Sequence, residues 1–393
     1  MKTVFFCLIQ ACLLSFASFA QAKGQISVMT LNQYLGADLA PIISTVDPGA
    51  FNQGLVAVLT QTAKSDFRAR ARAQARAIAS RLPDVLALQE VWELRCQDFD
   101  GNPTTGCEDP QIADAFTDHL ALTLAALKKK GVKYKKVALV KNLDLEKINV
   151  LGAPVAGLPF VIHDVPAFLV AVDRDAILVR ERITAQPVVL PQALCANPSI
   201  DGCNYQIAAE AITPAGPLRI ERGFIAIDAN IAGKDYRIFN THLEVKGEDL
   251  KPPLPLFTAF QAAQADELIR TIGFLATADK KTLLLGDMNS SPDQQSPAPG
   301  IVTPYQQFAA ANYLDIWTLR PGDLPGYTCC QDENLLNRKP SLEERIDMIL
   351  SVDNPENAKK IRVIGDNAST KATSHGLRLW FSDHAAVAAK LQF

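Results

Sequence analysis

Polar and ionisable residues stand near the ends of short apolar runs at several places in the chain. Carboxylate and amide side chains of this kind supply the oxygen ligands that a hard cation such as Mg²⁺ prefers. A histidine next to an aspartate suits a general base whose ring is oriented by a carboxylate. The residues in this pattern are Asn32, Glu90, His242, Asp287, Asn289, Asp347, Asp383 and His384.

The elements that must position these residues follow an α/β order. Residues 64–82 are rich in helix formers, Pro83 ends that segment, and Asp84-Val-Leu-Ala-Leu88 is typical of a buried strand. In α/β proteins, sites assemble in the crevice at the strand ends. We expect further helices at 112–130 and 257–276, a hairpin of 223–231 and 236–241, and strands at 26–31, 168–172, 176–179, 282–285, 346–352 and 385–391.

Each of these residues also has an ordinary structural interpretation. A carboxylate at a strand end is usually a cap or a partner in an ion pair. A lone histidine such as His242 is usually a buried polar residue with satisfied hydrogen bonds. The functional interpretation therefore depends on the whole set occurring in order.

Taken in order, six segments resemble the endonuclease/exonuclease/phosphatase superfamily. They are Met29-Thr-Leu-Asn32, Leu88-Gln-Glu90, Asn240-Thr-His-Leu243, Gly286-Asp-Met-Asn289, Arg345-Ile-Asp347 and Ser382-Asp-His384. The resemblance implies a four-layer α/β sandwich, in which two β-sheets face each other and helices cover the outside. It also implies a metal-dependent hydrolase of phosphodiesters.

The resemblance assigns a metal centre and a base. Asn32 and Glu90 would hold a divalent ion, with Asp383 as a further ligand or an orienting residue. The expected ion is Mg²⁺, with Mn²⁺ or Ca²⁺ as alternatives. His384 would be the general base, oriented by Asp347.

Further roles concern the phosphate. Asp287 and Asn289 would position the attacking water and bind the phosphate. His242 would hydrogen-bond the phosphate or protonate the leaving oxygen, and Arg222 matches a basic position near it. In-line attack builds charge on the phosphate oxygens, which a cation and fixed donors stabilise.

Three hypotheses for the substrate differ in class. A nuclease is the first, because His242 is typical of the deoxyribonuclease, deadenylase and sphingomyelinase branches. A sphingomyelinase-type phosphodiesterase acting on phospholipid headgroups is the second, and a non-catalytic phosphate-binding protein is the third. The formal charge of −3 excludes only a globally basic nucleic-acid binder.

Two kinds of surface bear on that choice. Arg68, Arg72 and Arg76 form one stripe of a helix, a pattern typical of a solvated face and less often of an anion-binding one. A lipid substrate needs an exposed apolar element. Residues 151–171 and 252–260 are candidates, although such segments are usually buried.

The N-terminal segment predicts export. Residues 1–22 have the form of a signal peptide that ends Ala20-Gln21-Ala22, so we expect a secreted or periplasmic protein without a stable membrane anchor. Six cysteines remain after residue 22. Proximity favours Cys96–Cys107 and Cys195–Cys203, whereas the adjacent Cys329 and Cys330 form either a vicinal disulfide or bonds elsewhere.

No linker divides the remaining sequence. We therefore expect one domain over residues 23–393, with insertions near 92–170 and 186–216, acting as a monomer.

Overall fold

The computed structural model describes residues 24–43, 45–146, 148–150, 153–155, 157–214, 216–247, 256–296 and 300–393. The predicted leader, residues 1–22, lies outside these ranges. Two eight-stranded sheets form the centre of the fold. The first sheet contains β1 (Gln25–Asn32), β2 (Val85–Gln89), β3 (Glu93–Asp98), β4 (Tyr134–Asp144), β7 (Leu158–Ile162), β8 (Val165–Arg180), β19 (Asn357–Ile364) and β22 (Ala386–Gln392).

The second sheet has the order β10-β11-β14-β15-β16-β18-β17, with β9 paired to β14. Its strands are β9 (Thr184–Pro187), β10 (Asn197–Ser199), β11 (Gly202–Asn204), β14 (Gly223–Ile231), β15 (Lys234–His242), β16 (Lys281–Asp287), β17 (Leu314–Asp315) and β18 (Asp347–Ser351). Smaller pairs are β5 (Ile148–Val150) with β6 (Ala153–Val155), β12 (Ala209–Thr213) with β13 (Gly216–Ile220), and β20 (Ala372–Ser374) with β21 (Leu377–Leu379).

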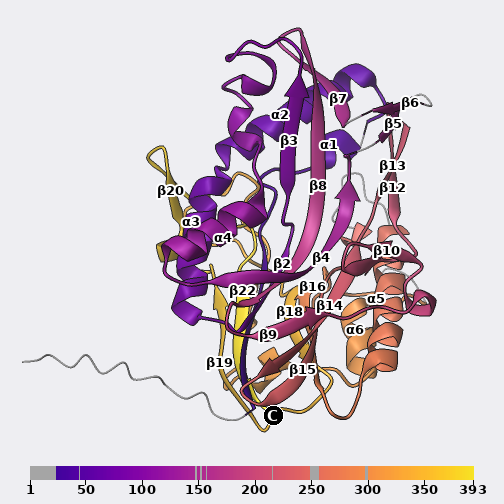
Figure 1. Cartoon of the computed structure of the whole chain (residues 1–393), viewed down its shortest axis with the longest axis vertical. Helices are drawn as coiled ribbons and strands as arrows, with labels where there is room; N and C mark the ends of the chain where they lie inside the picture. The colour runs from indigo at the N-terminus through magenta and orange to yellow at the C-terminus, as the bar shows by residue number, and fades with distance from the viewer. Residues whose placement is uncertain are drawn as a thin grey trace, which may run out of the picture.

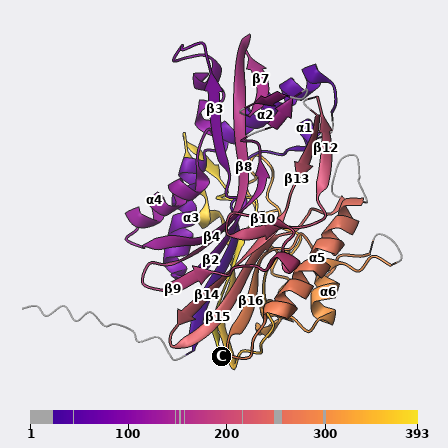
Figure 2. The ribbon, with the colours of Figure 1, turned by 45° about the vertical axis from the view of Figure 1, so that its right-hand side comes forward.

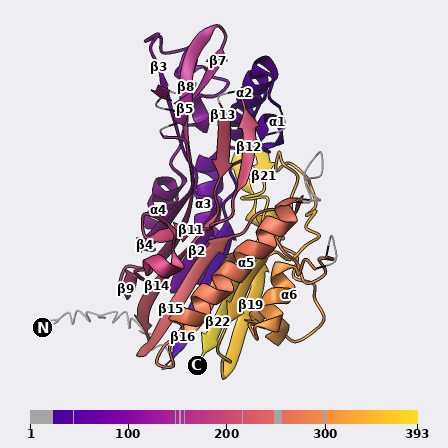
Figure 3. The ribbon, with the colours of Figure 1, turned by 90° about the vertical axis from the view of Figure 1, so that its right-hand side faces the viewer.

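Helices cover the outer face of each sheet (Figure 1). α3 (Phe67–Arg81) and α4 (His119–Lys129) pack on the first sheet, and α5 (Leu256–Leu275) and α6 (Pro304–Ala310) pack on the second. Figure 3 shows α5 lying along β15 and β16. The predicted four-layer sandwich is confirmed.

The alternation of side chains along each strand explains the layers. Val85 and Ala87 of β2 pack in the core between the sheets, where they join residues such as Ile238 of β15. Leu86 and Leu88 of the same strand pack instead with α3 and α4. A continuous apolar run is therefore what a strand buried on both faces requires.

A third apolar cluster lies at the upper end of the sandwich, where β3, β7 and the start of β8 extend beyond the other strands (Figure 2). α1 (Ala40–Ile43) and α2 (Pro48–Lys64) pack there, beside the hairpin of β12 and β13. Within the segment 151–171, Leu158, Phe160 and Ile162 are buried in this cluster rather than exposed.

The sequence predicts separate strands at 168–172 and 176–179, but the structure has a single strand, β8, across both. The charged residues Asp173, Arg174 and Asp175 lie in its middle. Arg174 is satisfied there by Glu93, at 2.7 Å, and by Asp118, at 2.6 Å. Ion pairing thus allows Arg174 to lie within a buried strand.

Three disulfides occur in the described residues. Cys96 bonds to Cys107 and Cys195 to Cys203, as proximity predicts. Cys329 bonds to its neighbour Cys330, the vicinal alternative.

The register of the strands brings the chemistry-bearing residues together. Asn32 pairs with Gln89 across the parallel strands β1 and β2. His242 pairs with Asp287 across β15 and β16, and Asp287 pairs with Asp347 across β16 and β18. These strand ends therefore meet at the same edge of the sandwich.

Gly286 is required for this register. Its φ is +151°, and a Cβ atom there would overlap the carbonyl oxygen of Thr241 on β15. We expect Gly286→Ala to lower the free energy of unfolding by about 3 kcal/mol in chemical denaturation. Gly273→Ala is the matched control, because Gly273 lies in α5 with open space around it and should gain about 1 kcal/mol. Equal effects of the two substitutions would contradict this account.

Candidate active site

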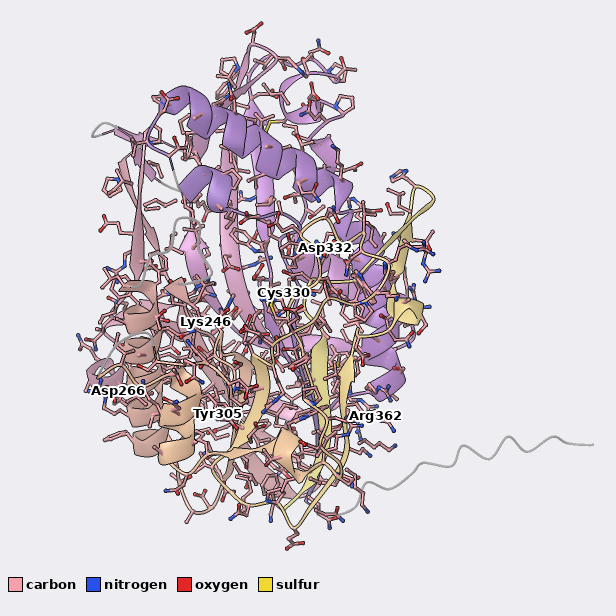
Figure 4. All side chains as sticks on the ribbon, turned by 180° about the vertical axis from the view of Figure 1, so that it is seen from behind. Lys246, Asp266, Tyr305, Cys330, Asp332 and Arg362 are labelled. Carbon is pink, nitrogen blue, oxygen red and sulfur yellow. A yellow bond between two sulfur atoms is a disulfide. The ribbon has the colours of Figure 1, made fainter. Side chains whose placement is uncertain are left out.

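The joined strand ends form one wall of a cleft of about 550 Å³. Cys330 and Lys246, which also line the cleft, lie near the middle of the face shown in Figure 4. Asn32 and Asp347 lie directly behind the lining and contact it through hydrogen bonds. The remaining predicted residues all line the cleft: Glu90, Arg222, His242, Asp287, Asn289, Asp383 and His384.

His384 and Asp347 form a buried pair. Nδ1 of His384 lies 2.8 Å from Oδ2 of Asp347, and both side chains are almost fully buried. Asp287 is the next carboxylate, with Oδ2 at 3.7 Å from the same nitrogen. Since Nδ1 is engaged, Nε2 is the ring atom left to act on a molecule in the cleft.

The charge of His384 is set by its neighbours. Burial alone would lower its pKa, but Asp347, Asp383 and Asp287 together raise the pKa well above the usual range. The backbone is also fixed, because His384 N–H donates to Ser382 Oγ at 3.1 Å and that hydroxyl donates to Asn32 O at 2.7 Å. The sequence-predicted base is thus rigidly held.

Asn32 connects two carboxylates that come from different sheets. Its Nδ2 donates to Glu90 Oε1 at 3.0 Å and to Asp287 Oδ2 at 3.1 Å. Its Oδ1 accepts from the backbone N–H of Tyr34 at 2.9 Å. In this arrangement the Asn32 amide positions the carboxylates, and Glu90 is the residue that presents oxygens to the cleft.

Three lining residues adopt a backbone conformation with positive φ, 62° for Tyr34, 51° for Glu90 and 47° for Asn289. This conformation is unfavourable for a glutamate and tolerated by asparagine. Hydrogen bonds hold Glu90 and Asn289 in this conformation. Leu35 N–H donates to Glu90 Oε2 at 3.0 Å, and Asn289 N–H donates to Asp287 Oδ1 at 2.9 Å. Such strain concentrates at functional sites.

His242 is oriented by Arg222. Nη1 of Arg222 lies 3.0 Å from Nδ1 of His242. Because a guanidinium only donates, Nδ1 must accept, and the ring proton belongs on Nε2. Nε2 lies 3.5 Å from Asp287 Oδ2, which can accept that proton, whereas Asn289 Nδ2, 3.0 Å away, is itself a donor and bonds to Leu243 O at 2.9 Å.

This environment keeps His242 neutral. Burial, and then the charges of Arg222 and His384, hold its pKa well below the usual range. Of the two expected roles, donating a hydrogen bond through Nε2–H fits a neutral ring, whereas protonating a leaving oxygen needs an imidazolium.

Two residues beyond the predicted set hold Arg222 in place. Asp173 Oδ2 lies 3.9 Å from its Nη1, and Glu244 Oε1 lies 3.5 Å from its Nη2. Asp173 and Glu244 are 4% and 1% exposed. In the sequence, the charged tripeptide 173–175 inside an otherwise apolar run is the pattern that could have indicated Asp173 as a buried ion-pair partner.

The donor set fits a hard divalent cation. Burial, together with repulsion from Glu90, raises the pKa of Asp383 to about 7. Asp347 Oδ1 is buried without a hydrogen-bond partner. Asp287, Asp347 and His384 also present ligand atoms within 4.8 Å of one another. Crowded carboxylate oxygens of this kind gain from a bound cation.

A model of the Endonuclease/Exonuclease/phosphatase family matches residues 51–384, and the chain belongs to this family. The family match supports a hydrolase of phosphoester bonds. A comparison with curated proteins finds no match.

Several solved structures are similar to this chain at low identity. A family protein from Leptotrichia buccalis C-1013-b is 16% identical, covers 94% of this chain and 100% of its own, and has a TM-score of 0.48. A family protein from Beutenbergia cavernae DSM 12333 is 18% identical over 94% of this chain and 72% of its own, with a TM-score of 0.48. TDP2 from D. rerio, complexed with a single-strand DNA product, is 13% identical over 94% of this chain and 100% of its own, with a TM-score of 0.47.

The contact between Arg222 and His242 can be tested by titration. In Arg222→Met we expect the pKa of His242 to rise, because a neighbouring positive charge is lost while Asp173 and Glu244 remain. ¹⁵N NMR of the imidazole rings measures this, and the unmodified protein should show the Nε2–H tautomer across neutral pH. Arg219→Met, which removes an exposed arginine paired with Glu221, is the control. An unchanged His242 titration in Arg222→Met would refute the assignment.

Proposed function

We propose that the protein is a divalent-metal-dependent phosphodiesterase that uses an activated water. The observation that carries this proposal is the His384–Asp347 pair, 2.8 Å apart, which shares a cleft with the Glu90 and Asp383 carboxylates and the Asn289 amide. A base, a set of oxygen ligands and neutral donors are the three components that water attack on a phosphodiester needs.

Each residue has a separate role in the proposed reaction. Nε2 of His384 accepts the proton of the attacking water, and Asp347 stabilises the imidazolium that results. Nε2–H of His242 and the amide of Asn289 donate to the phosphate oxygens, where negative charge grows in the transition state.

Glu90 and Asp383 would hold the metal, with Asn32 fixing the Glu90 carboxylate. A bound Mg²⁺, or Mn²⁺ or Ca²⁺ in its place, would neutralise charge on the phosphate and would offset the carboxylates that raise the pKa of His384.

Nucleic acid is the first substrate hypothesis from the sequence. The basic surface that would support this hypothesis is the stripe of Arg68, Arg72 and Arg76. These side chains are exposed on α3 and do not line the cleft. The cleft lining instead includes the apolar side chains of Ile43 and Phe257. This observation favours the second hypothesis, a phospholipid-type phosphodiesterase. Residues 252–255 of the second candidate lipid-binding segment lie outside the described ranges.

We also propose export and a single domain. The leader over residues 1–22 would be removed, and residues 23–393 would act as one monomeric domain, since residues of both sheets build one cleft. The paired cysteines support an oxidising compartment. Among the described residues, no helix has the length and apolar character needed to cross a membrane.

Export is testable by mass. The protein recovered from outside the cytoplasm should have an intact mass that corresponds to an N-terminus at Lys23. Recovery of a chain that retains residues 1–22 would contradict cleavage at this site. The free-thiol content of the recovered protein gives an independent check, because three disulfides leave none of the six cysteines reactive.

The catalytic assignment predicts a loss of activity. His384→Ala should lower kcat for bis(p-nitrophenyl) phosphate by about 10³-fold, because the general base is removed. His375→Ala, which changes an exposed histidine, should leave kcat unchanged. EDTA should abolish turnover, and Mg²⁺ should restore it.

Absence of turnover with Mg²⁺, Mn²⁺ and Ca²⁺ would favour the third hypothesis, a non-catalytic phosphate-binding protein. Plasmid DNA, RNA and sphingomyelin liposomes, assayed side by side, separate the other two. Liposome turnover without cleavage of nucleic acid would refute the nuclease hypothesis.

A further inference from the structure

An apolar cavity adjoins the catalytic cleft. It has a volume of about 100 Å³ and lies in the upper cluster, between α1 and α2 on one side and β3, β8 and β13 on the other. Its walls include Leu55 and Val58 of α2, Leu94 of β3 and Leu218 of β13. Protein interiors rarely contain voids larger than a water molecule, so a cavity of this size calls for an explanation.

The cavity lies directly against the cleft. Leu39, Ile43, Trp92, Asp173 and Arg222 line both the cavity and the cleft. Arg222 is the residue that contacts His242, whose Nε2–H faces the place proposed for the phosphate. A group attached to a phosphate bound there would therefore have the cavity beside it.

The lining determines what can enter. Apart from Asp173, Thr213, Glu221 and Arg222, the lining side chains are hydrocarbon or, at Trp92, aromatic. An apolar cavity of ~150 Å³ stays dry and takes up a benzene ring. The cavity beside the cleft is smaller, about 100 Å³, so it suits a compact group no larger than such a ring, part of which can remain in the adjoining cleft.

The charges around the cleft disfavour a polyanion. Asp38, Glu333 and Glu343 line it and form no ion pair with any described residue. Lys246 contacts Glu344 at 2.6 Å, so that cation is balanced by a carboxylate. A substrate with many phosphates would be repelled by these three carboxylates of the cleft lining.

We propose that the cavity is a specificity subsite, which seats a compact apolar substituent, aryl or branched alkyl, of the phosphodiester bound in the cleft. This inference rests on the proposed function, because it takes the phosphate to lie between His242 and His384. The residue that decides the preference is Val58, which is 5% exposed and lines the cavity but not the cleft.

The test uses two monoanionic ligands that differ in one substituent, methyl phenylphosphonate and methyl methylphosphonate. Calorimetric titration of the full chain with Mg²⁺ should give a Kd at least tenfold lower for the phenyl ligand. In Val58→Phe, which fills the cavity, the ratio should fall below twofold while the Kd of the methyl ligand stays the same.

Val56→Phe is the matched control, since Val56 lies on the same helix but does not line the cavity. It should keep the tenfold ratio. If Val58→Phe fails to fold by circular dichroism, Val58→Leu replaces it and should reduce the ratio partly. Equal Kd values for both ligands, or a ratio that survives in the Val58 variants, would overturn the proposal.

Other arms of the experiment identify the source of the apolar group. Dihexanoyl phosphatidylcholine that is hydrolysed with a KM raised in Val58→Phe supports a lipid source, and an aryl phosphodiester with the same behaviour supports an aryl one. Plasmid DNA cleaved with the same KM in both proteins would overturn the subsite but leave the phosphodiesterase intact. Absence of any turnover, with the tenfold Kd ratio retained, would refute the proposed function alone.

Discussion

The amide of Asn32 joins the two sheets at the point where their chemistry meets. It donates to Glu90, which follows β2 of the first sheet, and to Asp287 at the end of β16 of the second. Deeper in the sandwich, Gln89 Nε2 donates to Asn240 Oδ1 at 2.6 Å across the same gap. Buried polar groups are costly unless they are hydrogen-bonded. These contacts therefore fix the distance and register between sheets that are otherwise held by non-directional apolar packing.

The site depends on that registration because its pairs are divided between the sheets. Asp347 begins β18 in the second sheet, whereas His384 precedes β22 in the first. Arg222 precedes β14 in the second sheet, and its partner Asp173 lies on β8 in the first. Sliding one sheet over the other by a single residue would separate both pairs. The apolar core and the candidate active site therefore require the same registration of the two sheets.

The sequence predicted the residues at the strand ends, but it did not predict which side chains they contact. Short apolar runs that end in polar residues predicted β1, β2, β15 and β16 and the polar residues that lie in or behind the cleft, because each run is a local pattern. The donor to His242, the role of Asn32 as a bridge and the continuity of β8 could not be predicted in this way. Each of these features depends on contacts between residues far apart in the chain, such as Arg222 with Asp173 or Asn32 with Asp287. These contacts form only because the two sheets pack face to face.

β8 has a consequence for how such a protein diversifies. One end of this strand pairs with β2 inside the sandwich, and the other pairs with β7 in the upper cluster. Asp173, which supports the chemistry, and Leu169 and Ala171, which wall the apolar cavity, are neighbours on one face of the strand. Under the proposed function, substitutions in the outer half would reshape what is recognised while the inner half keeps the reaction unchanged. Selectivity and catalysis would then be adjacent on one strand but free to evolve separately.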